Sequence, residues 1–327
     1  MSLQEIQLKD VSRYRGELMG AAILFIVLFH VELPRSDAFF GLRRCGNIGV
    51  DMFLFLSGLG LWFSWVKNPS FKQFYQRRLL RIFPAWLIMS SLYYIPRFDM
   101  KTGSYIDLIG DITINWDFWL HDELTFWYIP AIMMLYLWAP LYMHLIRKHP
   151  VYRWLPVLMI VWCICVQWVT PIHQAVGHIE IFWSRVPIFF LGINFGEQVR
   201  QDVKMEKSTL WLLLLVFLAT ASACIYLEQV KHGRFPLFAE RMIYIPLTVS
   251  LLMLLTELFR HTPVWLNRSC AFLGTLSLEL YLIHHHFVMV YISPYHLGYW
   301  LTFLLTLVIA VPLAWLLHQL IKRIMPV

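Results

Sequence analysis

Apolar residues in this chain come in long runs separated by short charged segments. A helix needs about 20 mostly apolar residues to cross the hydrocarbon of a bilayer. Ten runs are candidates: 17–34, 47–66, 82–96, 123–146, 153–171, 181–196, 208–227, 242–259, 271–292 and 297–321. No segment alternates polar and apolar residues with a period of two, as strands of a membrane barrel do. The pattern therefore predicts an all-α polytopic membrane protein of about ten transmembrane helices.

Composition supports this class, because hydrophobic residues make up 59% of the chain and charged residues only 14%. A soluble domain of this length does not need so much apolar surface. We find no low-complexity linker or solenoid period, so we expect one integral domain over residues 1–327. Residues 1–16 are expected to be a cytoplasmic lead-in rather than a cleaved signal peptide. Residues 97–122, the longest polar stretch, are expected to form a loop on the outer side.

The formal charge of +7 raises the possibility of a nucleic-acid partner, but the distribution of the cations argues against it. With ten spans, 18 of the 27 Lys and Arg residues fall on the side of the N-terminus and 8 on the other. Short loops rich in Lys and Arg mark the cytoplasmic face. We therefore predict that both termini are cytoplasmic and that the net charge reflects membrane topology.

His30 lies inside the first apolar run. An imidazole in a membrane helix is costly and marks a functional site by default. Asp51, near the outer end of the second run, needs a partner for the same reason. His30 is the expected partner of Asp51, because the two residues lie at a similar depth. Glu32 is the less favoured alternative to Asp51 as the carboxylate that pairs with His30. The nearby Ser57-Gly58 pair is interpreted as a notch for close helix packing, rather than as a catalytic serine.

Three arginines, Arg77, Arg78 and Arg81, precede the run at 82–96. This run is expected to begin near them, with Pro84 in its first turn, where a missing amide costs little. Two interpretations stay open. The arginines are either membrane anchors whose side chains reach toward the interface, or bidentate ligands for the phosphates of a cytosolic molecule.

Glu123 and Trp127 stand at the outer start of the fourth run. Trp127 suits an interfacial anchor, since aromatic residues are enriched at membrane surfaces, and Glu123 suits a solvated position. Both are also candidates for binding a substrate on the outer side.

Ser277, Tyr281 and His284 fall at positions i, i+4 and i+7 of the ninth run, which places them on one helix face. They are further candidates for substrate binding. His284 is followed by two more histidines, but consecutive helical positions diverge by about 100°. We therefore expect no metal site.

Several of these motifs occur together in one known family. They are His30, Gly-Val-Asp-x-Phe-x-Phe-x-Ser-Gly at 49–58, Arg-Arg-x-x-Arg-x-x-Pro at 77–84, Trp-Tyr-x-Pro at 127–130, Arg185 with Phe-Phe-Leu-Gly at 189–192, and Leu-Gly-x-x-Ser-Leu-x-x-Tyr-Leu-x-His at 273–284. With these motifs in order over nearly its whole length, the chain resembles the acyltransferase 3 family of membrane acyltransferases, which is mostly bacterial. The resemblance implies transfer of an acyl group, usually acetyl, from cytosolic acyl-CoA to a hydroxyl of an envelope glycan or lipid-linked sugar.

One position departs from the family pattern. The family usually has an arginine eleven residues before the first-span histidine, where this chain has Met19. Arg15 lies one turn earlier on the same helix face and is expected to reach the same ligand. If it does not, binding of the acyl donor is in doubt.

The leading hypothesis is direct acyl transfer in a bacterial cytoplasmic membrane. Arg77, Arg78 and Arg81, with Arg15, would hold the acyl-CoA phosphates, and His30 would act as general base with Asp51 as its carboxylate partner. A proton-coupled transporter or flippase is an alternative, because membrane histidines and carboxylates relay protons. A non-catalytic ligand-binding membrane module is the third possibility. The sequence does not identify the acceptor or the length of the acyl group.

Overall fold

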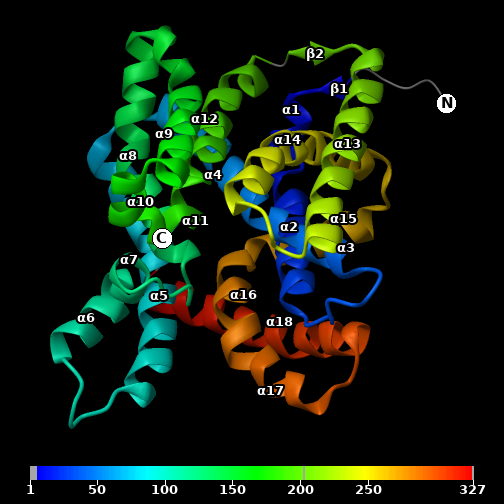
Figure 1. Ribbon diagram of the computed structural model, residues 1–327. Coiled ribbons are helices and arrows are strands. Elements are labelled where there is room, and N and C mark those ends of the chain that lie inside the picture. Colours follow the sequence, from blue (N-terminus) through cyan, green and yellow to red (C-terminus); the bar gives the residue numbers. More distant parts are fainter. Residues whose placement is uncertain (1–5, 202, 326–327) are drawn as a thin grey trace.

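The computed structural model describes residues 6–201 and 203–325, so the first five residues of the predicted lead-in lie outside the described residues. The longer helices are α2 (Arg15–His30), α4 (Ile48–Lys67), α5 (Phe71–Tyr94), α8 (Tyr128–Lys148), α9 (Leu155–Trp168), α12 (Val186–Arg200), α13 (Lys207–Lys231), α14 (Leu237–His261), α15 (Val264–Thr275) and α18 (Tyr299–Ile324). The shorter ones are α1 (Lys9–Arg13), α3 (Phe40–Arg44), α6 (Tyr105–Ile114), α7 (Trp116–Leu120), α10 (Thr170–Val176), α11 (Glu180–Trp183), α16 (Ser277–Ile283) and α17 (Val290–Ile292). Figure 1 shows that helices make up nearly the whole bundle, which confirms the all-α prediction.

The one sheet that the described residues form is small. β1 (Ile6–Gln7) pairs antiparallel with β2 (Lys204–Met205), so the N-terminal segment is tied to the connection between α12 and α13. The remainder of the lead-in folds as α1, which packs against α12 and α14. This segment is therefore an ordered part of the bundle's end.

Seven described helices are long and apolar enough to cross a membrane, or up to eight if the bent pair 170–183 and 186–200 counts as one span. The chain is thus an integral membrane protein, while the number ten and the cytoplasmic termini stay predictions. Two expected spans differ from a continuous helix of full length. α2 has only 16 residues, and the run at 271–292 is divided near Leu276 between α15 and α16.

Helix α5 begins earlier than expected. Ser70 caps its first turn, since the Ser70 hydroxyl accepts a hydrogen bond from the Gln73 amide at 3.4 Å. The arginine cluster therefore lies within the helix, and the expectation that Pro84 occupies the first turn is wrong because Pro84 lies in the helix interior. The shift has a simple cause: residues 71–81 are too polar to be recognised as part of an apolar run. Helix α8 begins later than expected, at Tyr128 instead of residue 123.

Helix α2 packs closely against α15, with backbone nearly touching backbone (Figure 1). A Cβ atom at Gly20 would overlap the carbonyl oxygen of Cys270, and one at Gly274 would overlap the carbonyl oxygen of Gly16. Small residues permit this approach in membrane helices, where van der Waals packing drives association. The contact holds α2, which carries His30, against the segment that leads into α16.

Helices α4 and α12 make a second close crossing. A Cβ at Gly58 would overlap the carbonyl oxygen of Phe189, and one at Gly192 would overlap the carbonyl oxygen of Phe55. The predicted packing role of Gly58 is therefore confirmed.

We expect Gly20→Ala to destabilise the protein by about 1–3 kcal/mol, because the added methyl group must push α15 away. Gly16→Ala is the matched control on the same helix and interface. Its Cβ would meet Ala271 at an ordinary contact distance of 3.5 Å, so its stability should be unchanged or slightly higher. Thermal unfolding of both variants in detergent measures the difference, and equal transition temperatures would contradict the packing argument.

Candidate active site

A narrow cavity of about 60 Å³ lies between α2, α4, α5, α8 and α16. Residues from five distant parts of the sequence meet in it. Those with polar or charged groups are Arg15, Ser57, Arg78, Arg81, Tyr128, Tyr136, Ser277 and Tyr281. The structure thus brings together five residues predicted for the site: Arg15, Arg78, Arg81, Ser277 and Tyr281.

A wider groove of about 730 Å³ adjoins this cavity. The two share Arg78, Arg81, Ser277 and Leu278 as lining residues, so they form one path. Arg77 and Lys322 add two further cations to the groove. The path is therefore broad and cationic at one end and narrow at the other.

Arg15 occupies the part of the cavity next to Met19. Its Nε donates a hydrogen bond to the carbonyl oxygen of Leu56 at 3.1 Å. The absence of a side chain at Gly60 makes room for the guanidinium, since a Cβ there would lie 3.0 Å from the Arg15 Cζ. Arg15 and Met19 line the same cavity, as their spacing on one helix face predicts.

Arg78 lies where the groove meets the cavity. Its Cζ is 5.8 Å from the centre of the Phe74 ring and 5.9 Å from that of Tyr136. Its Nε is buried and finds no acceptor among the described residues. A buried guanidinium N–H without an acceptor is costly, and an anion in the groove would supply one.

Tyr281 and Tyr128 lie at the far side of the cavity. The Tyr281 hydroxyl accepts a hydrogen bond from the backbone N–H of Tyr128 at 3.3 Å, and their ring centres are 5.2 Å apart. His284 follows one turn after Tyr281, with 6.2 Å between the ring centres. The narrow cavity therefore leads from the arginines toward His284.

His284 contacts His30 directly. The Nε2 atom of His284 lies 3.2 Å from Nδ1 of His30, and this Nδ1 lies 2.8 Å from the carbonyl oxygen of Ile26. The other nitrogen of His284, Nδ1, faces the carbonyl oxygen of Leu280 at 2.8 Å.

These contacts assign the protons. Carbonyl oxygens only accept hydrogen bonds, so each Nδ1 carries the proton of a neutral ring. The His30 Nδ1–H then points between the Ile26 oxygen and the lone pair on His284 Nε2. The arrangement leaves Nε2 of His30 with a lone pair of its own, which makes it the atom suited to accept a proton.

The three consecutive histidines lie in a π-helical segment, residues His284–Met289. His285 is also close to His30, with 4.9 Å between their ring centres, whereas His286 packs on Phe126 at 4.5 Å. His30 therefore contacts two of the three consecutive rings. Among the described residues, no group of three or more His, Cys, Asp or Glu side chains is suited to hold a metal ion.

Asp51 is not paired with His30, contrary to our prediction. Its Oδ2 lies 3.6 Å from Nε of Arg185, and both side chains are only 1% exposed. The Arg185 guanidinium also lies over the ring of Trp127, 5.0 Å from its centre. From the sequence, Arg185 was identified only as part of a motif. Its charge within an apolar run was the signal that Asp51 had another available partner besides His30.

Glu123 and Trp127 lie at the start of α8, in different surroundings. Glu123 is exposed in the turn before the helix, where its backbone N–H donates to the carbonyl oxygen of Asp117 at 3.2 Å. Trp127 is half-buried against Arg185. Neither residue lines the narrow cavity.

The polar stretch 97–122 contains α6 and α7 and is ordered. Asp111 accepts a hydrogen bond from the Asp117 backbone N–H at 2.9 Å, which joins the two helices. Burial raises the pKa of the Asp111 carboxyl to about 6. Residues 97–122 therefore form a structured segment near the start of α8.

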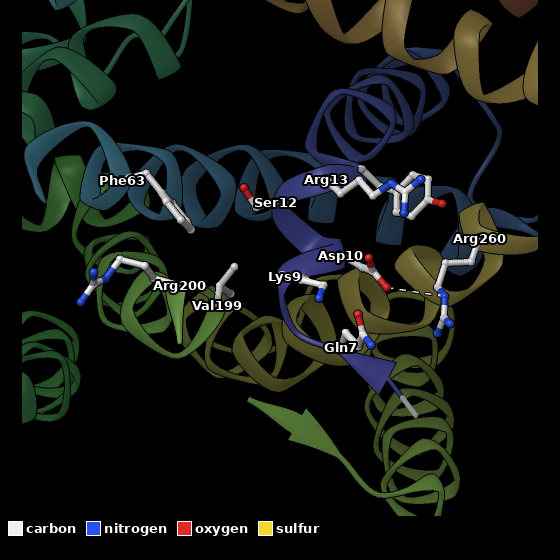
Figure 2. Close-up of a pocket in the computed structure, with 10 residues that line it drawn as sticks. Gln7, Lys9, Asp10, Ser12, Arg13, Phe63, Val199, Arg200 and Arg260 are labelled. Atoms are coloured by element: carbon white, nitrogen blue, oxygen red, sulfur yellow. Dashed lines mark ion pairs between the residues drawn. The ribbon is translucent and has the colours of Figure 1, made fainter. Parts of the chain in front are cut away.

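A separate cavity of about 670 Å³ lies beside the N-terminal segment (Figure 2). Its charged residues include Lys9, Arg13 and Arg200, and an ion pair of 3.5 Å joins Asp10 to Arg260. None of the residues predicted for the active site lines it. Lys9, Arg13 and Arg200 are among the cations that the ten-span prediction assigns to the side of the N-terminus.

Comparison with known proteins agrees with the motifs. A family model described as an acyltransferase domain matches residues 20–319. The chain is similar to the Regulator of hypoxia-inducible factor 1 of Caenorhabditis elegans, with 32% identity over 39% of this chain and 33% of the relative. It therefore spans about a third of the length of that relative. No solved structure matches the chain.

The Asp51–Arg185 contact predicts how Asp51→Asn will behave. The substitution leaves a buried guanidinium without its counter-charge, so we expect a loss of about 3–5 kcal/mol in stability. The double variant Asp51→Asn/Arg185→Met should recover much of it, and Glu123→Gln, at an exposed carboxylate, should change little. Thermal unfolding in detergent measures all three. If Asp51→Asn keeps its stability but loses activity, Asp51 acts in catalysis rather than in folding.

Proposed function

Because the chain belongs to the acyltransferase 3 family, we propose that it is a membrane O-acyltransferase. It takes an acyl group, in the first instance acetyl, from cytosolic acyl-CoA and transfers it to a hydroxyl of an envelope glycan or lipid-linked sugar in a bacterial cytoplasmic membrane. The observation that carries this proposal is the succession of three features: the cationic groove adjoins the narrow cavity, Tyr281 in that cavity lies one helical turn before His284, and His284 contacts His30.

The groove suits the phosphates of the donor. Arg77 and Arg81 are exposed there, and Arg78 presents a buried N–H without a protein acceptor. Guanidinium groups bind phosphate oxygens through paired, charge-assisted hydrogen bonds. Arg15, deeper in the cavity, takes the role of the arginine that the family pattern has at the position of Met19.

The distance to the base suits a donor with a long flexible arm. Arg15 and His30 are the two ends of α2, which spans about 22 Å at 1.5 Å per residue. The pantetheine arm of acyl-CoA extends along this direction, and the narrow cavity, at about 60 Å³, widens to admit it. Ser277 and Tyr281 then lie along the arm, and the thioester reaches the region of His284.

The reaction needs one proton to be moved. His30 Nε2 takes the proton from the acceptor hydroxyl as the oxygen attacks the thioester carbonyl carbon. A C–O bond forms, the C–S bond breaks, and the leaving thiolate takes the proton back from the His30 imidazolium. The products are an ester and CoA, with no net change in protons.

His284 takes the part that we first assigned to Asp51. Its Nε2 lone pair accepts from His30 Nδ1–H, which fixes the orientation and tautomer of the base. It also stabilises the positive charge that His30 gains during the reaction. Unlike a carboxylate, the imidazole of His284 carries no fixed negative charge. A third imidazole, that of His285, also lies near His30.

We expect acetyl-CoA to raise the transition temperature of the purified protein in detergent. At one hundred times its Kd, a ligand stabilises the folded state by about 2.7 kcal/mol. Neutralising Arg77, Arg78 and Arg81 to Gln together should remove the shift, whereas Arg268→Gln, at an exposed arginine that does not line the groove, should keep it. A folded protein that responds to no acyl-CoA would favour the transporter or the non-catalytic module instead.

We also expect His30→Ala to abolish acylation in folded protein, measured as transfer of labelled acetyl from acetyl-CoA to the host's membrane fraction. His284→Ala should lower kcat by about 10²-fold or more, with acetyl-CoA binding unchanged. His285→Ala is the matched control, since its ring is equally near but no hydrogen bond to His30 is formed among the described residues. Its loss should be much smaller. Full activity in His30→Ala would refute the assignment of the base.

A further inference from the structure

The last two turns of α18 present a polar face within an otherwise apolar helix. Trp315, His318, Gln319 and Lys322 occupy positions i, i+3, i+4 and i+7, and all four line the cationic groove. Figure 1 shows α18, in red, passing beside α16 and extending toward α5. Polar residues on a membrane-spanning helix are costly and mark functional surfaces. This face has no role in the transfer step.

The face combines three kinds of group. Trp315 is 45% exposed and offers an aromatic surface. Gln319 offers an amide with both donor and acceptor. Glu279, on α16, is held in place by His318, whose Nδ1 lies 2.6 Å from the Glu279 Oε1 atom, and its carboxylate is a further acceptor on the same wall.

The part of the groove lined by α5 is cationic, with Arg77 and Arg81 exposed there. Lys322 places another cation at the end of α18. A ligand that matches both parts of the groove carries several phosphates, a flat ring and an edge with hydrogen-bond donors and acceptors. A purine nucleotide has all three features.

We propose that this groove is a nucleotide subsite in which the adenine of the acyl donor lies on Trp315, with its edge toward Gln319 and Glu279. The inference rests on the proposed function. A Gln amide can pair with the N6 and N7 atoms of adenine, and the Glu279 carboxylate can accept from the exocyclic amine. The phosphates then face Arg77, Arg81 and Lys322.

The sizes of the two spaces support this placement. The groove measures about 730 Å³ and the narrow cavity about 60 Å³, whereas pockets for drug-sized ligands measure roughly 300–1,000 Å³. The groove falls within this range and the narrow cavity lies far below it, so the nucleoside is placed in the groove. The site consequently selects CoA thioesters over thioesters of the same arm without a nucleoside.

The test compares two ligands by calorimetric titration of the whole protein in detergent: acetyl-CoA, and acetyl-phosphopantetheine, which lacks the nucleoside. Loss of the stacking of one base weakens binding by roughly tenfold. Trp315→Ala should therefore weaken acetyl-CoA binding about tenfold and leave acetyl-phosphopantetheine unchanged, and Trp315→Phe should largely retain the binding. Trp300→Ala is the control, because Trp300 is an exposed tryptophan on the same helix outside the groove.

Gln319→Leu gives a second measurement if Trp315→Ala does not fold. It should weaken the binding of acetyl-CoA and leave the binding of acetyl-phosphopantetheine unchanged. Unchanged acetyl-CoA binding in both variants, or an equal loss for both ligands, would overturn the nucleotide subsite while leaving the proposed function intact. Such a result would make Trp315 a membrane anchor. If the unaltered protein binds neither ligand, the proposed donor is wrong and the subsite is overturned with it.

Discussion

The close crossing of α2 with α15 is the constraint on which the site depends. Helix α2 carries Arg15 at one end and His30 at the other, and α15 leads directly into α16, which carries Ser277 and Tyr281. Gly20 and Gly274 allow the two backbones to meet without intervening side chains. The register between the helices is therefore defined by backbone contact, and it places the start of the π-helical segment after α16 beside His30.

The bundle also contains charges that do not belong to the path. Asp51 and Arg185 are fully buried, and a second ion pair between Arg241 and Glu180 lies nearby on α14 and α11. Such pairs contribute little net stability, but removing one partner is costly. The Asp51–Arg185 pair joins α4 to the residue that precedes α12, near the crossing where Gly58 and Gly192 bring the two backbones together. The Arg241–Glu180 pair joins α14 to α11. These charges are thus paired with one another and not with the imidazoles of His30 and His284.

Much of this arrangement could be predicted, because lipid permits few backbone structures and long apolar runs therefore indicate helices. Helical spacing alone predicts that Ser277 and Tyr281 share a face and that Arg15 and Met19 line a common cavity. The partner of Asp51 could not be predicted, since depth in the membrane restricts a residue to a layer but not to a neighbour within it. The start of α5 was missed because polar residues extend the helix beyond its apolar part. The contact of His30 with both His284 and His285 could not be predicted either, because it depends on how α2 meets the segment that follows α16.

The separation between the cationic groove and the imidazole pair explains why one small bundle can combine recognition with chemistry. Interactions made with a remote part of a substrate can be used to position the reacting part. In the proposed function, the groove binds the phosphates and the ring of the donor at one end of the path, where Arg81 and Lys322 are exposed. A neutral base is best kept away from such cations, because a nearby positive charge disfavours the protonated form that His30 must adopt during the reaction. The length of α2 provides this distance, and in the proposed function the uncharged arm of the donor spans it.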